Sequence, residues 1–244
     1  MQASTVAPPP RTYSFDSQLS PVEQARFNMI EQQIRPWDVL DGEILHLLSV
    51  VRREEFVPPE HRAIAFVDLE IPLSADVEQS MRLGQCMLSP KVEARLLQDL
   101  ELKPNQRVLE IGAGSGYMAA LLGASCERVI SLEIDERLAK MASANLQRAG
   151  IGNVQVRQAD GAHGAPDDGP FDAIVLSGSV AEVPQLLLAQ LRVGGRLVAI
   201  VGQLPMMRAT VVMKSGKDSW QSLQPWDTVA PRLVNFPEPS RFVF

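Results

Sequence analysis

Apolar residues recur at helical spacing through the first hundred residues of the chain. Residues 21–34 carry Val22, Ala25 and Met29 three or four positions apart, which is the period of an amphipathic helix. Ser20 stands directly before this stretch as a candidate N-cap. Stretches with the same period predict further helices over 41–51, 60–66 and 91–102. The first part of the chain is therefore predicted to be helical.

From residue 104 onward, short apolar runs alternate with stretches of helical period. Strands are predicted over 107–110, 128–133, 153–157, 171–176 and 196–201, with shorter candidates over 210–213 and 232–234. Helices are predicted from residue 118, over 135–149 and over 184–191. Such alternation indicates a mainly parallel sheet with helices on both faces. The predicted fold class is α/β, a doubly wound sheet preceded by an N-terminal helical cap.

These patterns divide the chain into three parts. Residues 1–19 contain Pro8-Pro9-Pro10 and no periodic apolar pattern, so we expect a disordered tail there. Residues 20–103 are expected to form the helical cap and a loop that reaches the substrate. Residues 104–244 are expected to form a Rossmann-like domain. At 244 residues the chain can bury the core of one large domain, or of one domain plus a cap.

Residues 108–117 read VLEIGAGSGY and join a strand to a helix through Gly112, Gly114 and Gly116. Glycine lets the backbone approach a ligand where a Cβ atom would collide. The start of the following helix offers unpaired N–H groups to the same ligand. The turn therefore predicts a ligand site at the end of the first strand.

The spacing of the glycines narrows the choice of ligand. A dinucleotide fingerprint would need a small residue where the chain has Tyr117. Glu110 would repel a pyrophosphate but suits a ligand with an amino group or a sulfonium. Glu133 ends the second strand, where a carboxylate can accept hydrogen bonds from both hydroxyls of a ribose. These residues predict an S-adenosylmethionine (SAM) site; the alternative is an ordinary strand–helix turn with glycines for packing.

Three more residues stand at predicted strand ends. Asp160 and Gly161 follow the third strand, and Ser177 follows the fourth. The carboxyl ends of parallel strands meet at one edge of a sheet, where ligands of such folds bind. We therefore count Asp160, Gly161 and Ser177 with the SAM-binding residues.

Charge and composition exclude several functional classes. The formal net charge of -6 argues against nucleic-acid binding, which needs a basic face. No apolar run approaches the ~18 residues that span a bilayer, and the first residues lack the apolar core of a secretory signal. Cys86 and Cys126 have neither metal-ligand nor disulfide spacing. We expect a cytoplasmic monomer that binds no metal, nucleic acid or membrane.

Several stretches of the chain resemble the protein-L-isoaspartate O-methyltransferase family. Residues 29–35 resemble its first helix, and 53–58, reading REEFVP, resemble its RxxFVP signature. VLEIGAGSGY is close to the family's VLEIGTGSGY, while 169–174 and 194–198 resemble its fourth and fifth strands. The resemblance covers residues 24 to 236.

The resemblance implies SAM-dependent O-methylation of the side-chain carboxylate of isoaspartyl residues in damaged proteins. The ester then collapses to a succinimide, which water reopens partly as normal aspartate. Asp160 matches the acidic residue that accepts a hydrogen bond from the adenine amino group in the family. Because a carboxylate acceptor is already ionised at neutral pH, positioning supplies most of the acceleration. The implied partners are isoaspartyl peptides or proteins.

The loop before the glycine strand departs from the family. The family reads G-Q-T-I-S-x-P, and its serine hydroxyl faces the substrate carboxylate, whereas residues 84–90 read GQCMLSP. Cys86 takes the threonine position, Leu88 takes the serine position, and Ser89 comes one residue late. Gln85 and Cys86 are expected to contact the substrate. Either the loop bulges so that Ser89 serves as the catalytic hydroxyl, or Leu88 faces the acceptor. The second case favours a SAM-binding homologue with lost or altered acceptor specificity.

Overall fold

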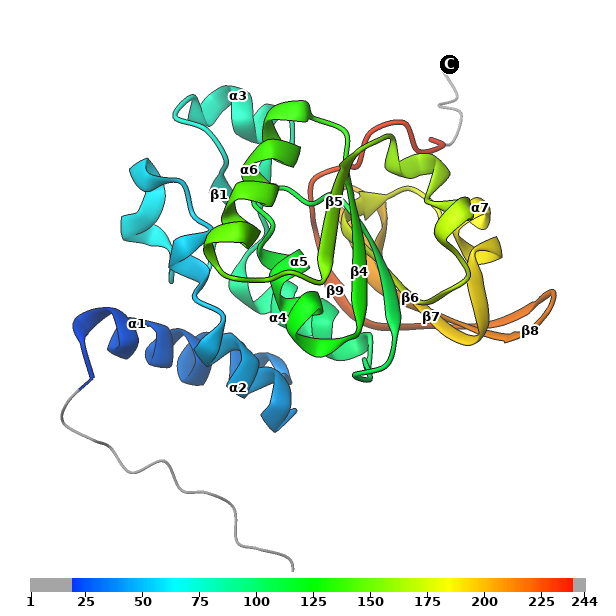
Figure 1. Ribbon diagram of the computed structural model, residues 1–244, viewed down its shortest axis with the longest axis horizontal. Coiled ribbons are helices and arrows are strands. Elements are labelled where there is room, and N and C mark those ends of the chain that lie inside the picture. Colours follow the sequence, from blue (N-terminus) through cyan, green and yellow to red (C-terminus); the bar gives the residue numbers. More distant parts are fainter. Residues whose placement is uncertain (1–18, 239–244) are drawn as a thin grey trace, which may run out of the picture.

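A seven-stranded sheet lies at the centre of the computed structural model, which describes residues 19–238 (Figure 1). Its strands are β3 (Arg107–Ile111), β4 (Arg128–Glu133), β5 (Val154–Gln158), β6 (Phe171–Val180), β7 (Leu191–Gln203), β8 (Met206–Gly216) and β9 (Ser219–Thr228). Their order across the sheet is β5-β4-β3-β6-β7-β8-β9. The strands from β5 to β7 pair in parallel, and β8 and β9 add an antiparallel edge. The predicted fold class, a mainly parallel α/β sheet, is confirmed.

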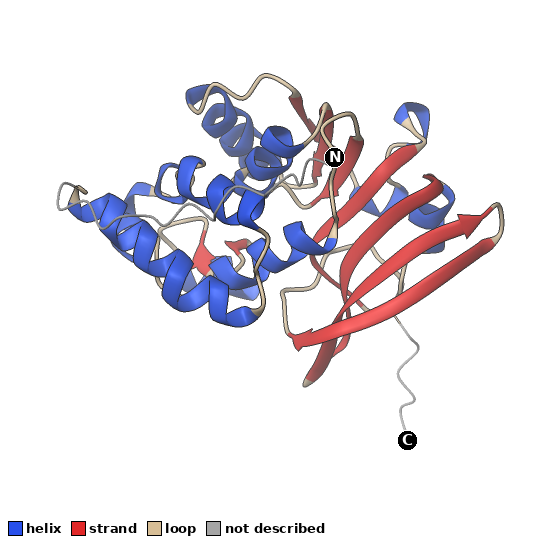
Figure 2. Cartoon of the chain, turned by 90° about the horizontal axis from the view of Figure 1, so that it is seen from below, coloured by secondary structure: helices blue, strands red, loops and turns tan. Residues whose placement is uncertain are grey.

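Helices cover both faces of this twisted sheet (Figures 1 and 2). One face packs against α4 (Pro90–Asp99), α5 (Tyr117–Ser125) and α6 (Glu136–Arg148), and the other against α7 (Gln185–Ala189). Since side chains alternate along a strand, Val108 joins the hydrophobic cluster on the first face and Leu109 the cluster on the second. Burial on both faces explains why the central strands β3 and β6 read as continuous apolar runs in the sequence.

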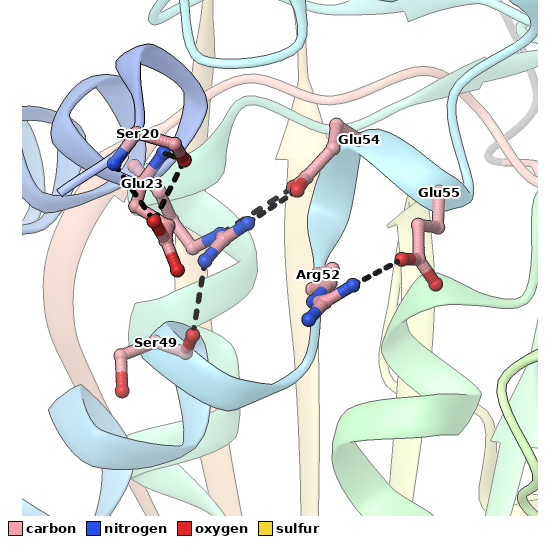
Figure 3. Close-up of polar contacts among 7 residues, drawn as sticks. Ser20, Glu23, Ser49, Arg52, Glu54 and Glu55 are labelled. Atoms are coloured by element: carbon pink, nitrogen blue, oxygen red, sulfur yellow. Dashed lines mark hydrogen bonds and ion pairs between the residues drawn. The ribbon is translucent and has the colours of Figure 1, made fainter.

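Two helices, α1 (Pro21–Met29) and α2 (Gly42–Val50), precede the sheet. Figure 3 shows the capping box of α1: the Ser20 hydroxyl accepts from the Glu23 N–H at 3.3 Å, and the Glu23 carboxylate accepts from the Ser20 N–H at 2.9 Å. Arg26 on α1 pairs with Glu54, so α1 is held to the 3-10 turn Arg53–Glu55 that follows α2. The same hydrophobic cluster contains residues of both helices and of the sheet, so the helical part and the sheet share a core.

A separate two-stranded sheet carries the loop that departs from the family pattern. It pairs β1 (Ile71–Pro72) with β2 (Cys86–Met87) in antiparallel register, and α3 (Val77–Arg82) lies between them. The Asp76 carboxylate caps α3 by accepting from the Gln79 N–H at 3.0 Å. α3, β1 and β2 are not predicted from the sequence, because each is too short to show a period.

Two predicted helices differ from the structure. The helix predicted over 21–34 is α-helical only to Met29 and continues as a π turn over Ile30–Ile34. The helix predicted over 60–66 is a 3-10 helix over Pro59–Ile64, whose side chains include no fully buried residue to hold a longer helix.

Two strand predictions near the C-terminus also need correction. The strand predicted over 232–234 is wrong, because in the described residues it forms only an isolated bridge from Arg232 to Ser179. β9 is not predicted from the sequence, because its side chains are mostly exposed and give no alternating pattern. The run predicted over 210–213 lies within the longer β8.

The predicted disordered tail, residues 1–19, lies outside the described residues except for Leu19. Among the described residues, no helix combines the length and the apolar composition needed to cross a membrane.

Candidate functional site

The glycine turn follows β3, the strand at which the order of the sheet changes from one side to the other. β3 is followed by β4 on one side, while β6 lies on its other side. Gly112, Gly114 and Gly116 all adopt left-handed backbone conformations, with φ of 92°, 53° and 84°. Residues with a Cβ rarely adopt such values, which explains the three glycines. A cavity opens at this switch point, where ligands of such sheets bind.

The three glycines do not have the same role. Gly112 and Gly114 line the cavity. A Cβ atom on Gly116 would instead lie 3.1 Å from the backbone of Ala142 in α6. Gly116 therefore permits close packing of α5 on α6 and lies outside the cavity wall.

Glu133 ends β4 and lines the same cavity. Its carboxylate accepts from the Gly114 N–H at 2.9 Å and from the Asp135 N–H at 3.0 Å. Burial raises the pKa of Glu133 above its usual range, although the backbone N–H donors oppose that shift. The carboxylate thus links the glycine turn to the start of α6, and its remaining acceptor capacity suits the hydroxyls of a ribose.

Glu110 lies behind the cavity wall and is fully buried. Its carboxylate accepts from the Ser131 hydroxyl at 2.5 Å and from the Ser177 hydroxyl at 3.0 Å. Burial raises the pKa of Glu110 to about 7, against the opposing effect of the two hydroxyl donors. Ser177 does line the cavity, so it is the member of this pair that a ligand could touch.

Asp160 and Gly161 close the cavity at the end of β5. One carboxylate oxygen of Asp160 accepts from the Ala162 N–H at 3.0 Å, and the other accepts from the Asn235 side-chain amide at 2.9 Å. A Cβ atom on Gly161 would lie 2.3 Å from the Ile111 side chain, so glycine is required there for packing. Asp160 already binds an amide N–H in this structure, and it presents the same acceptor to an amino group of a ligand.

Gln85 and Cys86 approach the cavity from the β1–β2 unit. The Gln85 amide donates to the Asp135 carboxylate at 3.0 Å and accepts from the Arg137 guanidinium at 2.9 Å. Arg137 also donates to the carbonyl of Leu73 at 3.0 Å. These bonds hold the loop against the start of α6 and over the cavity.

Leu88 and Ser89 lie on the far side of that loop. Both line a second cavity, of about 590 Å³, whose opposite wall includes Met206 and Arg208 from β8. The Leu88 side chain is buried, and its carbonyl accepts from Arg53 at 2.8 Å. Ser89 is the N-cap residue of α4 without a side-chain capping bond. The structure therefore brings Gln85 and Cys86 to the first cavity and places Leu88 and Ser89 at the second.

The C-terminal segment is the part of the site that sequence reasoning misses. Arg232, Leu233 and Phe236 line the first cavity. Leu233 lies over the turn, 3.2 Å from the position of a Cβ atom on Gly112. The segment is held to β6 by the Ser179 N–H, which donates to the Pro231 carbonyl at 2.7 Å. No sequence signal indicates that this irregular segment returns to the glycine turn.

The first cavity presents the groups that a nucleoside-bearing ligand needs. Carboxylates stand at the ends of β4 and β5, and backbone without Cβ atoms stands at the end of β3. Among the described residues, no group of three or more His, Cys, Asp or Glu side chains could hold a metal ion. The carboxylates and the open backbone of the cavity can bind an organic ligand through hydrogen bonds and close contact.

Comparisons with known proteins agree with this geometry. The family model of protein-L-isoaspartate(D-aspartate) O-methyltransferase matches residues 24–229. A protein-L-isoaspartate O-methyltransferase of Opitutus terrae is 38% identical over 209 residues, which cover 83% of this chain and 86% of that protein. Protein-L-isoaspartate O-methyltransferase 1 of Rhodopseudomonas palustris is 42% identical over 177 residues, which cover 72% of this chain and 69% of that protein.

Solved structures give the same result for the fold. A protein-L-isoaspartate O-methyltransferase superposes with a TM-score of 0.71 at 25% identity, over 86% of this chain and 65% of that one. A Plasmodium falciparum structure described under the same name, in complex with S-adenosyl-L-homocysteine, gives a TM-score of 0.68 at 19% identity. That comparison covers 88% of this chain and 99% of the other, and it concerns the fold alone.

Proposed function

Because the chain belongs to the protein-L-isoaspartate(D-aspartate) O-methyltransferase family, we propose that it methylates the side-chain carboxylate of isoaspartyl residues in damaged proteins, with SAM as the donor. The observation that carries the proposal is a single cavity lined by the glycine turn, Glu133 and Asp160, which come from the ends of three neighbouring strands. These are the residues that the sequence pattern assigns to SAM.

The residues of the cavity fit the parts of the donor. Glu133 would accept hydrogen bonds from the ribose hydroxyls, and Asp160 would accept one from the adenine amino group. Gly112 and Gly114 would let the backbone lie against the ligand. Ser177, predicted to follow its strand, lies instead within β6, with its backbone carbonyl 3.5 Å from the position of a Cβ atom on Gly112. When bound, SAM supplies a methyl group that is already activated on a sulfonium.

The chain itself has little acid–base chemistry to perform. An isoaspartyl carboxylate is ionised at neutral pH and can attack without a general base. Alignment of the carboxylate oxygen with the methyl carbon and the sulfur would supply most of the acceleration. The loop 84–90 would cover the transfer site and exclude water, because Gln85 anchors it to Asp135 and Arg137.

A second candidate function is a SAM-binding homologue with a lost or altered acceptor. The observation that favours it is the loop itself, where Cys86 and Leu88 stand in the family's threonine and serine positions. Leu88 offers no hydrogen bond to an acceptor, and Ser89 follows it at the start of α4. In this second candidate, Leu88 takes the family's serine position and faces the acceptor. The alternative, in which Ser89 serves as the catalytic hydroxyl, stays a prediction.

The proposal includes a cytoplasmic monomer divided into a helical cap, residues 20–103, and a SAM-binding domain, residues 104–244. In the described part of the chain both cysteines are free, which suits a reducing compartment.

Methyl-labelled SAM with an isoaspartyl peptide and its aspartyl twin tests the proposed function. We expect a base-labile methyl ester on the isoaspartyl peptide alone. Label on neither peptide, from protein that binds SAM, would favour the second candidate.

A further inference from the structure

One face of the β1–β2 sheet carries the carboxyl group of Glu70 beside Cys86 and Leu88, the residues that replace the family's threonine and serine. Ile71 pairs with Met87, and Pro72 pairs with Cys86. Continuing this antiparallel register by one residue beyond β1 and β2 places Glu70 opposite Leu88. Side chains two residues apart on a strand share a face, and cross-strand partners share it too. Glu70, Cys86 and Leu88 therefore lie together on one face.

Residues of this face line both cavities. The Cys86 thiol lies close enough to the Glu70 carboxyl group for each to shift the pKa of the other. Cys86 lines the cavity of the glycine turn, whereas Glu70 and Leu88 line the second cavity. A methyl group held in the first cavity and an acceptor entering through the second would therefore meet at this face.

No cation in the described residues forms an ion pair with Glu70. Around the second cavity, Lys91 pairs with Asp68 at 2.7 Å, and Arg208 pairs with Asp227 at 2.9 Å. The thiol of Cys86 faces Glu70 from β2, and burial keeps that thiol protonated by raising its pKa well above its usual range.

Burial also raises the pKa of Glu70, and the Cys86 thiol opposes this only in part. A second carboxylate beside Glu70 would raise its pKa further, because two like charges at one site favour the uptake of a shared proton.

We infer that Glu70 binds the acceptor carboxylate as a neutral acid and so replaces the hydroxyl that is absent at Leu88. This inference rests on the proposed function. On binding, Glu70 takes one proton from solvent and donates it in a hydrogen bond to one oxygen of the isoaspartyl carboxylate. Its other oxygen stays on the side of the Cys86 thiol.

The transfer step balances without another reagent. The free oxygen of the acceptor carboxylate forms a bond to the methyl carbon while the carbon–sulfur bond breaks, and the bonding electrons return to sulfur. The products are the methyl ester and S-adenosylhomocysteine. The proton stays on Glu70 and returns to solvent when the neutral ester leaves, since the ester no longer offers an anionic partner.

Proton uptake on binding tests the inference directly. The full chain, saturated with S-adenosylhomocysteine, is titrated with an isoaspartyl peptide at pH 7.5 by calorimetry in buffers of different ionisation enthalpy. We expect uptake of about one proton in the wild type and none in Glu70→Gln, which keeps a neutral donor and binds the peptide at least as tightly. Glu70→Ala should bind more than about tenfold more weakly, and the exposed control Glu78→Gln on α3 should behave like the wild type.

Equal proton uptake in wild type and Glu70→Gln, or tight binding by the wild type with no uptake, would overturn the inference. Methyl transfer in the labelled-SAM assay, together with peptide binding that takes up no proton in calorimetry, would remove the role of Glu70 and leave the proposed function intact. Peptide binding with proton uptake but no transfer would support Glu70 and contradict the proposed function. Absence of binding by every variant would overturn both.

Discussion

At the scale of single residues, Glu110 shows how burial changes an acid. Its carboxyl group is fully buried, and Ser131 and Ser177 donate to it. Its pKa rises to about 7, from a value near 4.5 when exposed. The folded protein therefore holds a proton on Glu110 between pH 4.5 and 7 that the unfolded chain releases. Because the unfolded chain binds fewer protons in this window, the free energy of unfolding falls as pH rises through it.

Glu110→Gln should remove this part of the pH dependence. An amide stays neutral, so the variant should lose less stability than the wild type between pH 5 and pH 8. The expected difference is about 1–3 kcal/mol, given 1.36 kcal/mol for each pKa unit. Urea unfolding at several pH values measures it, with the exposed Glu127→Gln as the control. Parallel stability curves for wild type and Glu110→Gln would contradict this account of the buried acid.

Gly114 carries the backbone of the proposed donor site. It has φ of 53° and lines the cavity, so a valine there would strain the turn and fill space meant for the ligand. Gly114→Val should remain folded and show no measurable affinity for S-adenosylhomocysteine by calorimetry.

Gly150 provides the matched control for this substitution. It has φ of 71°, and no atom lies within 4 Å of the position that a Cβ atom would take, so valine there imposes similar backbone strain away from the cavity. Gly150→Val should cost about 1–2 kcal/mol in the free energy of unfolding and leave ligand affinity unchanged. Unchanged affinity in a folded Gly114→Val protein would remove the glycine turn from the donor site.

At the scale of elements, Arg53 connects three segments that are distant in sequence. It is fully buried, donates to the carbonyls of Ala65 and Leu88 at 3.1 and 2.8 Å, and pairs with Glu93 on α4. Its guanidinium also lies 5.1 Å from the ring centre of Tyr117 on α5. Arg53 thereby fixes the backbone of the loop 84–90 against the core.

Arg53→Ala should destabilise the protein by about 3–5 kcal/mol, because it leaves the buried Glu93 without its partner. The neighbouring Arg52 is the control: it is exposed and pairs with the half-exposed Glu55 at 3.1 Å (Figure 3). Arg52→Ala should cost less than about 1 kcal/mol. Similar unfolding midpoints in urea for the two variants would show that the buried network does not stabilise the loop.

Elements with strong periodicity could be predicted from the sequence. β3, β4, β5 and α6 follow the predicted ranges closely, whereas β6 and β7 are longer than the predicted 171–176 and 196–201. β9 could not be predicted, because its packing depends on pairing with β8 and most of its side chains remain exposed. The β1–β2 unit likewise depends on a pairing between residues more than ten positions apart.

At the scale of the whole molecule, the strand-end residues of the candidate donor site could be predicted from the sequence, whereas the C-terminal segment of the same cavity and Glu70 could not. Glu133 and Asp160 stand at strand ends, and the topology of a parallel sheet brings strand ends together. The C-terminal residues Arg232 to Phe236 reach the same cavity only through the path of the folded chain after β9 (Figure 1). Glu70 joins the loop through cross-strand pairing, which no local pattern indicates.

The most direct test of the central claim is the ratio of kcat/KM for an isoaspartyl peptide and its aspartyl twin, measured with methyl-labelled SAM at saturation. The same preparation should bind S-adenosylhomocysteine in calorimetry. We predict a methyl ester on the isoaspartyl peptide and a rate for the aspartyl twin at the background of the assay. Intact binding of S-adenosylhomocysteine with equal rates for the two peptides, or with no transfer to either, would contradict the claim.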